Sequence, residues 1–388
     1  MMKMKMIYQL WICLILFTVF ACNPAQKKES IENHSKAESF GPVKVEYAVG
    51  FDVRYSEGYK IIELPNPWQG SRSPLTYVLR NAETPKIDSI SDLGNEIIIP
   101  LESIICNSTS HLSLLEVLGL ETKLKGFAQT KYVYSPKINQ LIDSGEVVEV
   151  GIEAQMNVEQ ILDISPDAVM AFSTGQENKQ LNKLNELGLD VIMNADYMES
   201  TLLGRAEWLK FVALFFDKEV EANLYFDGLA NRYDALINIV KMEKYPRVFS
   251  GTVYGSTWFM PAGQNYNAIL IKDAGGKYLW SDDNGTGWLN IDFEAVYEKA
   301  SEAEYWIGAS DFKSLEVLKS VDSRYADFNA FKLNQVYTYT NKINSKGAND
   351  YFESGNVNPD KILADHIKIL HPELLPNYDL YYYKQLYE

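Results

Sequence analysis

Cysteine is scarce in this chain of 388 residues, which contains three copies. Cys13 and Cys22 belong to the N-terminal segment, so Cys106 stands alone in the remainder and no internal disulfide is expected. Stability must therefore come from packing, for which a hydrophobic content of 46% is ample. Cys106 itself follows Ile104 and Ile105, and we expect it to be buried at the end of a strand.

Histidine is also scarce, with four copies in the whole chain. His34 lies in a polar stretch near the N-terminus. His366 and His371 are five residues apart, so they do not share a helix face as an i,i+4 pair would. A zinc or manganese site needs three or four converging His and carboxylate ligands, so a bare-metal site is not expected.

Basic residues are outnumbered, with 36 Lys and Arg against 52 Asp and Glu and a net charge of −16. No basic stripe runs along the sequence. Because nucleic-acid phosphates are bound by clustered Lys and Arg, this charge balance argues against a nucleic-acid partner.

Common catalytic motifs are absent as well. The chain has no G-x-S-x-G nucleophile elbow, no H-E-x-x-H zinc motif, no Walker A loop and no G-x-G-x-x-G fingerprint. We therefore expect that the protein is not an enzyme.

The first 21 residues have the pattern of a signal peptide, with Lys3 and Lys5 ahead of an apolar run. The run ends in Val-Phe-Ala-Cys22, which resembles a bacterial lipoprotein signal whose cysteine is lipidated. Residues 22–42 are polar and read as a lipidated flexible tether. We expect an extracytoplasmic, periplasm-facing lipoprotein that contacts the membrane only through its lipid anchor. An ordinary signal or an uncleaved anchor is the alternative.

The central part of the chain alternates short strands with helices. Residues 43–82 first alternate apolar and polar positions, which predicts a β-hairpin at the start of the fold. From residue 100 onward, strands follow helices at the spacing of βαβ units, which indicates a mostly parallel sheet. The N-terminal lobe, with its hairpin extension, is predicted over residues 43–197.

A purely helical segment follows over residues 198–243. Its apolar residues recur with a period of 3.6 from Lys218 to Lys241, which predicts one helix about 35 Å long. The strand–helix alternation then restarts and defines a C-terminal lobe over residues 244–388. The fold class is therefore α/β, with two lobes of mostly parallel sheet joined by a long rigid helix.

A short internal echo links the two lobes. VEQILDISPDAVMAF aligns without a gap with FEAVYEKASEAEYWIG. In each segment a glutamate, Glu159 or Glu294, stands second in an amphipathic helix that leads through an acid and an alanine into a strand.

A longer series of segments resembles, in its order and spacing, the class III periplasmic solute-binding proteins of ABC importers, which bind ferric siderophores and cobalamin. The segments are SIICNSTSHLSLLEVLGL, KGFAQTKYVYSP, VGIEAQMNVEQILDISPDAVMAF, the long helix and GWLNIDFEAVYEKASEAEYWI. The resemblance covers about residues 97–385, and LGRAEW and NDYFES are similar to the longer, lipoprotein-type members. It implies a ligand cleft between the lobes of a monomer that delivers a small-molecule metal chelate to a permease dimer.

Two acidic residues are implicated in docking by this resemblance. Glu159 and Glu294 match the residues that, in the family, pair with arginines of the permease dimer. A simpler interpretation is that both acids only stabilise the start of a helix, because a helix N-terminus favours negative charge. The two interpretations are compatible.

The ligand contacts are predicted from loops that follow strands. A polar loop opens a helix whose free N–H groups can face a ligand, and plain capping is the alternative. Aromatic residues on other loops match the family's cleft positions, although each can also be structural. The candidate residues are Ser108, Thr109, Ser110, His111, Tyr132, Phe172, Trp258, Trp288, Asp350 and Tyr351.

A ferric siderophore is the leading ligand, with cobalamin or another corrinoid, or haem, as alternatives; no further cofactor is expected. Glu153 stands where the cobalamin binder has a tryptophan, which argues against cobalamin itself. Few arginines fall at candidate cleft positions, which favours a neutral or weakly charged chelate, although Lys131 and Lys346 can supply positive charge. The alternative hypotheses from other functional classes are an extracellular hydrolase and an adhesin.

Overall fold

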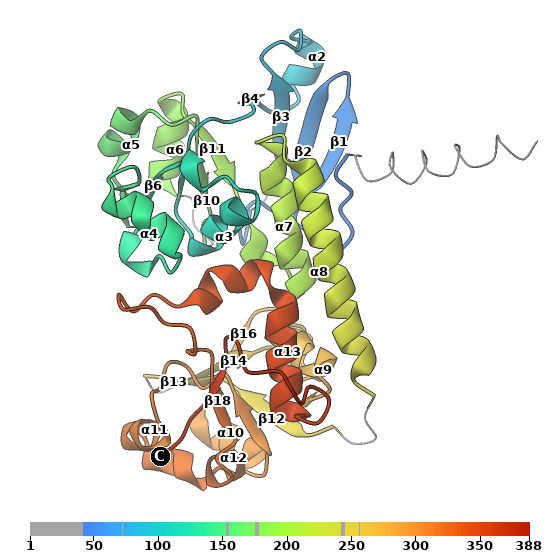
Figure 1. Ribbon diagram of the computed structural model, residues 1–388, viewed down its shortest axis with the longest axis vertical. Helices are drawn as coiled ribbons and strands as arrows, with labels where there is room; N and C mark the ends of the chain where they lie inside the picture. Colours follow the sequence, from blue (N-terminus) through green and yellow to red (C-terminus); the bar gives the residue numbers. More distant parts are fainter. Residues whose placement is uncertain (1–41, 72, 153–154, 175–177, 242–244, 256) are drawn as a thin grey trace, which may run out of the picture. The chain divides into compact units, whose positions relative to one another are not determined.

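The computed structural model describes residues 42–71, 73–152, 155–174, 178–241, 245–255 and 257–388, and Figure 1 shows their arrangement. The predicted signal peptide, the tether, Cys22 and Glu153 lie outside these residues. Within the described ranges, no helix combines the length and the apolar character needed to cross a lipid bilayer.

An N-terminal sheet precedes the first lobe and is larger than the predicted hairpin. Its strands lie in the order β1-β2-β3-β4, with the first two pairings antiparallel and the last parallel. The sequence did not predict β4, because its NEIII has consecutive isoleucines instead of an alternation. The elements are β1 (Asp52–Ser56), β2 (Tyr59–Leu64), β3 (Leu75–Asn81), α2 (Asp88–Ser91) and β4 (Asn95–Ile99).

The first lobe contains a parallel sheet in the order β11-β10-β5-β6-β7. Its strands β5 and β10 are apolar at every position because both faces are covered; all of β5, IIC, and of β10, AVMA, is buried. The strands are β5 (Ile104–Cys106), β6 (Leu124–Phe127), β7 (Val148–Glu149), β10 (Ala168–Ala171) and β11 (Asp190–Met193), beside the small pair β8 (Gly151–Ile152) and β9 (Gln155–Met156). The helices are α3 (Thr109–Val117), α4 (Pro136–Asp143), α5 (Val158–Ile164) and α6 (Lys179–Glu186).

Two packed helices, α7 (Leu202–Leu214) and α8 (Glu219–Ile239), connect the lobes (Figure 1). The 21 residues of α8 span about 32 Å at 1.5 Å per residue, close to the predicted length. Nearly every residue of α7 is buried.

Carboxylates on and just before α7 hold the chain that enters the N-terminal sheet. Glu207 accepts the backbone N–H groups of Glu46, Tyr47 and Ala48 at 2.6–3.1 Å. Glu199 accepts those of the next two residues, with its nearest contact to Gly50 at 2.8 Å. The charge of Glu207 is balanced by the buried ammonium group of Lys210, 2.8 Å away. We call this arrangement the carboxylate clamp.

The second lobe repeats the architecture around a sheet in the order β15-β12-β17-β18-β19, which is parallel except for β19. The strands are β12 (Arg247–Ser250), β15 (Lys277–Tyr278), β17 (Tyr305–Ile307), β18 (Val336–Thr338) and β19 (Lys384–Gln385), with a side sheet of β13 (Thr252–Tyr254), β14 (Thr257–Pro261) and β16 (Trp288–Ile291). The helices are α9 (Tyr266–Asp273), α10 (Phe293–Ala300), α11 (Leu315–Val321), α12 (Asn329–Lys332) and α13 (Pro359–Leu370).

The hydrophobic cores follow the same division. One cluster gathers the first lobe, the inner face of the N-terminal sheet and most of α7, and another gathers the second lobe with the middle of α8. The predicted α/β class, with lobes of mostly parallel sheet joined by a long helix, is confirmed.

Candidate functional site

A cavity of about 530 Å³ is lined by residues of both lobes, and we call it the interlobe cavity. Its walls come from the carboxyl ends of strands: Asn107 follows β5, Phe172 follows β10, and Tyr339 follows β18. Ligands of parallel α/β sheets bind outside the carboxyl ends of the strands, because the connecting loops gather there. Position and size therefore make this cavity the candidate ligand site.

Predicted residues of the first lobe meet at this cavity. Ser108, Thr109, Tyr132 and Phe172 all line it. The amide of Asn107 holds the backbone of Phe172 in place, accepting its N–H at 3.0 Å and donating to its carbonyl at 3.3 Å. The Tyr132 side chain is 48% exposed and carries the ammonium group of Lys131 over its ring.

Ser110 and His111 lie deeper than the sequence suggested. The hydroxyl of Ser110 lies 3.0 Å from that of Ser108, and the His111 ring is fully buried inside α3. Burial lowers the pKa of His111 to about 3, so the ring is neutral. The ring therefore does not reach the cavity surface.

Trp258 and Trp288 have opposite surroundings although they stand on paired strands. Trp258 is fully buried, and its indole N–H donates to the carbonyl of Ser250 at 3.0 Å. It packs against Phe249 and Trp306, so it is a core residue rather than part of a cavity wall. Trp288 is 57% exposed and lines a smaller cavity.

This smaller cavity, of about 200 Å³, lies in the second lobe and shares Ser310, Tyr339 and Phe352 with the interlobe cavity. Its walls are rich in aromatic rings, and the predicted residue Tyr351 lies among them, stacked on Tyr339 with ring centroids 5.0 Å apart. Further lining residues are Phe259, Tyr266, His366 and Tyr383. The sequence did not indicate Tyr339 and Phe352, which line both cavities.

Residues 339–357, which we call the crossing segment, lead from the second lobe onto the first. The carbonyl of Phe352 accepts a hydrogen bond from Thr109 at 3.0 Å, and Asn344 donates to the carbonyl of Val133 at 3.0 Å. The ammonium group of Lys346 donates to Asn139 at 2.6 Å. The predicted Asp350 is buried within this segment and does not line the interlobe cavity.

Glu353 makes a further contact between the crossing segment and the first lobe. Its two carboxylate oxygens accept the backbone N–H groups of Tyr134 at 2.7 Å and Ser135 at 2.8 Å, just before α4. Burial, together with the charges of Glu116 and Asp350, raises the pKa of Glu353 to about 8, although the two N–H groups lower it. A single buried carboxyl group thus ties the second lobe to the first.

Glu159 and Glu294 lie where the echo predicted, each in the first turn of its helix and exposed. The Glu294 carboxylate lies 2.9 Å from the guanidinium of Arg324, which also binds Asp322 at 2.7 Å. For Glu159, no basic side chain of the described residues lies within 4.0 Å. Both acids are accessible to a partner.

No cluster of three or more His, Cys, Asp or Glu side chains suited to hold a metal ion occurs in the part of the chain that the structure describes.

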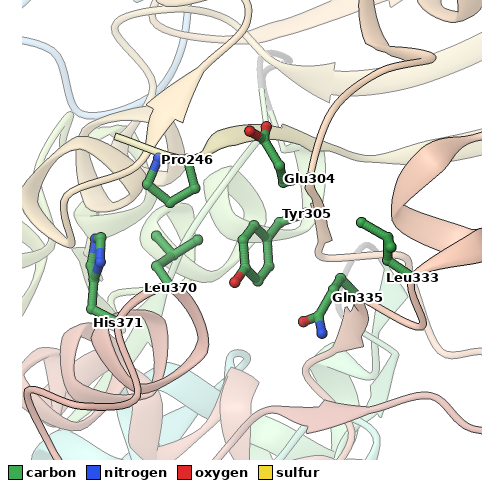
Figure 2. A pocket seen from close by; sticks show the side chains of 7 residues that line it. All are labelled: Pro246, Glu304, Tyr305, Leu333, Gln335, Leu370 and His371. Atoms are coloured by element: carbon green, nitrogen blue, oxygen red, sulfur yellow. The ribbon is translucent and has the colours of Figure 1, made fainter. Parts of the chain in front are cut away.

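Another cavity, of about 480 Å³, lies at the opposite end of the second-lobe sheet (Figure 2). Pro246, Glu304 and Gln335 each come just before a strand, so this cavity faces the amino ends of the strands. Glu304 is paired with Arg247, and His371 contacts the carbonyl of Gly275 at 3.0 Å. Because its polar groups are engaged and its position is the unfavoured one, we do not assign it to a ligand.

The comparisons with known proteins agree with the fold. The model of the family described as periplasmic binding protein matches residues 104–343. An uncharacterized lipoprotein of Methanocaldococcus jannaschii is 26% identical, covering 93% of this chain and 92% of its own.

Solved structures share the fold at lower sequence identity. A possible iron-binding periplasmic protein of Staphylococcus epidermidis is 17% identical with a TM-score of 0.56, covering 70% of this chain and 100% of its own. The periplasmic heme-binding protein of Vibrio cholerae is 15% identical with a TM-score of 0.53, covering 68% of this chain and 99% of its own.

Proposed function

The chain belongs to the periplasmic binding protein family, and from this premise we propose that it captures a metal chelate outside the cytoplasm and delivers it to the permease of an ABC importer. The observation that carries the proposal is the interlobe cavity, because a space enclosed by two lobes can hold a small molecule and release it when the lobes separate. Its volume of about 530 Å³ lies within the usual range of small-molecule sites.

A ferric siderophore is the first candidate ligand. The cavity offers both polar groups and apolar rings, with Asn107, Ser108 and Asn349 beside Phe127, Phe172 and Phe352. Such a lining suits a chelate whose organic shell is partly apolar and whose donor atoms stay polar. A haem or corrinoid is the second candidate, favoured by the aromatic rings of the adjoining cavity, against which a flat macrocycle can stack.

Attachment and docking are parts of the same proposal. A lipid on Cys22 would hold the protein at the membrane, and residues 23–42 would let it reach the permease. Glu159 and Glu294, one on each lobe, would pair with basic residues of the permease dimer and fix the orientation of the bound protein. We propose that a monomer performs this task.

A tryptophan-fluorescence titration against ferric siderophores, haem and cobalamin tests the ligand. Trp288 is half-exposed in the smaller cavity and should report binding nearby, so Trp288→Phe should remove most of the signal change. Trp68→Phe is the matched control, because Trp68 lines a different pocket and should leave the signal intact.

If no member of the panel changes the tryptophan fluorescence of the wild-type protein, the transport proposal is contradicted. An adhesin that has this fold and binds no small molecule would give this absence of a fluorescence change. A hydrolase would instead convert a member of the panel, which chromatography of the recovered ligand would reveal.

A further inference from the structure

Arg205 is a basic residue in an otherwise buried helix. It stands on α7, where the twelve other residues from Leu202 to Leu214 are all buried, and its own side chain is half-buried. Its guanidinium carbon lies 4.7 Å from the centre of the Tyr266 ring. Tyr266 begins α9 and lines the smaller cavity, so Arg205 lies against a residue that lines that cavity.

The charge of Arg205 has no ion-pair partner in the described chain. No carboxylate oxygen of the described residues lies within 4.0 Å of its guanidinium nitrogens, and its Nε is buried without a hydrogen bond. A buried charge is normally paired, because removal from water is costly. The guanidinium therefore has donor capacity to offer to something else.

Asp196 is the carboxyl group that attracts Arg205 electrostatically, although the two do not form an ion pair. Burial raises the pKa of Asp196, and the positive charge of Arg205 acts against this rise. One carboxylate oxygen of Asp196 accepts a hydrogen bond from Asn356 at 3.0 Å, and the hydroxyl of Ser110 supplies another. Asp196 is thus engaged with neutral donors, and the guanidinium of Arg205, which hydrogen-bonds the Tyr266 side chain, has no carboxylate within ion-pair distance among the described residues.

Two tyrosine hydroxyl groups complete the arrangement. Tyr266 and Tyr351 both line the smaller cavity and both interact electrostatically with Arg205. A guanidinium stacked on an aromatic ring keeps its plane fixed, and its parallel N–H groups match the two oxygens of a carboxylate. Phenol groups beside it can donate further hydrogen bonds to the same anion.

We propose that Arg205, with Tyr266 and Tyr351, forms a subsite for a carboxylate group of the ligand on the side of the smaller cavity that these two tyrosines line. This inference rests on the proposed function and narrows it to a chelate that carries at least one carboxylate. It replaces the expectation of a neutral or weakly charged ligand, which rested on the apparent lack of arginines near the cleft.

The test compares ligands that differ only in their carboxylates. Calorimetry with haem and with haem dimethyl ester is run beside ferric citrate and a cationic ferric trihydroxamate. Wild-type protein should prefer the carboxylate members. Arg205→Gln should weaken binding of haem or ferric citrate about ten- to hundredfold and leave the ester and the trihydroxamate unchanged.

Arg54→Gln is the matched control, because Arg54 pairs with Glu63 on the N-terminal sheet, away from the cavity. It should change no affinity. If Arg205→Gln does not fold, as judged by its thermal unfolding, Arg205→Lys takes its place. Lysine keeps the positive charge but lacks the parallel N–H groups of the guanidinium, so the ratio of acid to ester affinity should fall severalfold.

Three results would overturn the subsite while leaving the transport proposal standing. They are a wild-type preference for the ester or the trihydroxamate, an unchanged acid affinity in the Arg205 variants, and an equal loss for acid and ester. Absence of binding by the wild-type protein to this set and to the fluorescence panel would instead count against the proposed function itself.

Discussion

The helices that carry Glu159 and Glu294 begin alike and have different surroundings. Each acid occupies the second position of its helix, and each helix leads into a buried strand of a parallel sheet. Glu294 shares the guanidinium of Arg324, which also lies over the Phe293 ring, 3.9 Å from its centre. Glu159 has no such neighbour among the described residues. The same local pattern therefore supplies a bare carboxylate on one lobe and a partly compensated one on the other.

This difference matters for the proposed docking, because a carboxylate that already has a cation gains less from a second one. If both acids meet basic residues of a permease, the first lobe should contribute more to the contact than the second. Two experiments break or sharpen this comparison, and a third tests the contact between the lobes.

Removing both acids should have the largest effect. Glu159→Ala combined with Glu294→Ala should lower uptake into proteoliposomes that contain the permease by at least about tenfold, because charge pairs across an interface fix its orientation. Ligand affinity, measured by calorimetry, should not change.

The matched control is Asp163→Ala with Glu298→Ala, which removes exposed acids from the same two helices. Uptake should then stay near the wild-type level. Loss of ligand affinity in the first double variant would show that these acids belong to the ligand site instead.

The single variants should separate the lobes. Glu159→Ala should weaken docking about fivefold and Glu294→Ala about twofold, the range expected of single exposed ion pairs. Arg324→Gln should make the two acids equivalent, so that Glu294→Ala in that background costs as much as Glu159→Ala. Docking is measured as affinity for the permease in nanodiscs, and equal effects of the two single changes in the wild-type background would contradict the comparison.

The smallest effect concerns the contact between the lobes. The pKa of Glu353 is raised from 4.5 to about 8, so the folded protein binds an additional proton between these values and its stability falls as pH rises through them. Burial also lowers the pKa values of His111 and His366, which reduces stability only below about pH 6.5.

Thermal unfolding between pH 6.5 and 9 avoids the protonation of these histidines and covers the pH at which Glu353 loses its proton in the folded protein. Glu353→Gln removes the ionisation, so its unfolding temperature should rise relative to the wild-type protein by about 2–4 °C across this range. Ser354→Ala is a control in the same segment and should keep the wild-type slope. A wild-type slope in Glu353→Gln would show that Glu353 is not the titrating group.

Much of the fold could be predicted because the periodicity of apolar residues indicates which face of a helix or strand is buried. The 3.6-residue stripe of α8 and the alternation of short strands with helices both survive in the structure. The N-terminal sheet was only half predicted, because the parallel partner of β3 comes from a run of isoleucines after a helix.

The cavity walls were harder to predict because they depend on which face a residue presents. Trp258 and Phe259 are adjacent in the chain, and the pairing of β14 with β16 sends the tryptophan into the core while Phe259 lines the smaller cavity. Aromatic content cannot distinguish such neighbours. The contact between Arg205 and Tyr266 could not be predicted for a related reason: the two residues are distant in sequence, one on the connecting helix α7 and the other on α9 of the second lobe.

The carboxylate clamp has a mechanical consequence. Five successive backbone N–H groups, from Glu46 to Gly50, are held by Glu207 and Glu199, which stand on and just before α7. After the single hydrogen bond from the Val43 N–H to the Tyr55 hydroxyl, a pull applied at residue 42 is therefore borne by α7 and the residues just before it. Hydrogen bonds that are loaded together share the force, so the carboxylate clamp should resist this pull. Tension on the N-terminal end should therefore not separate the lobes at the interlobe cavity.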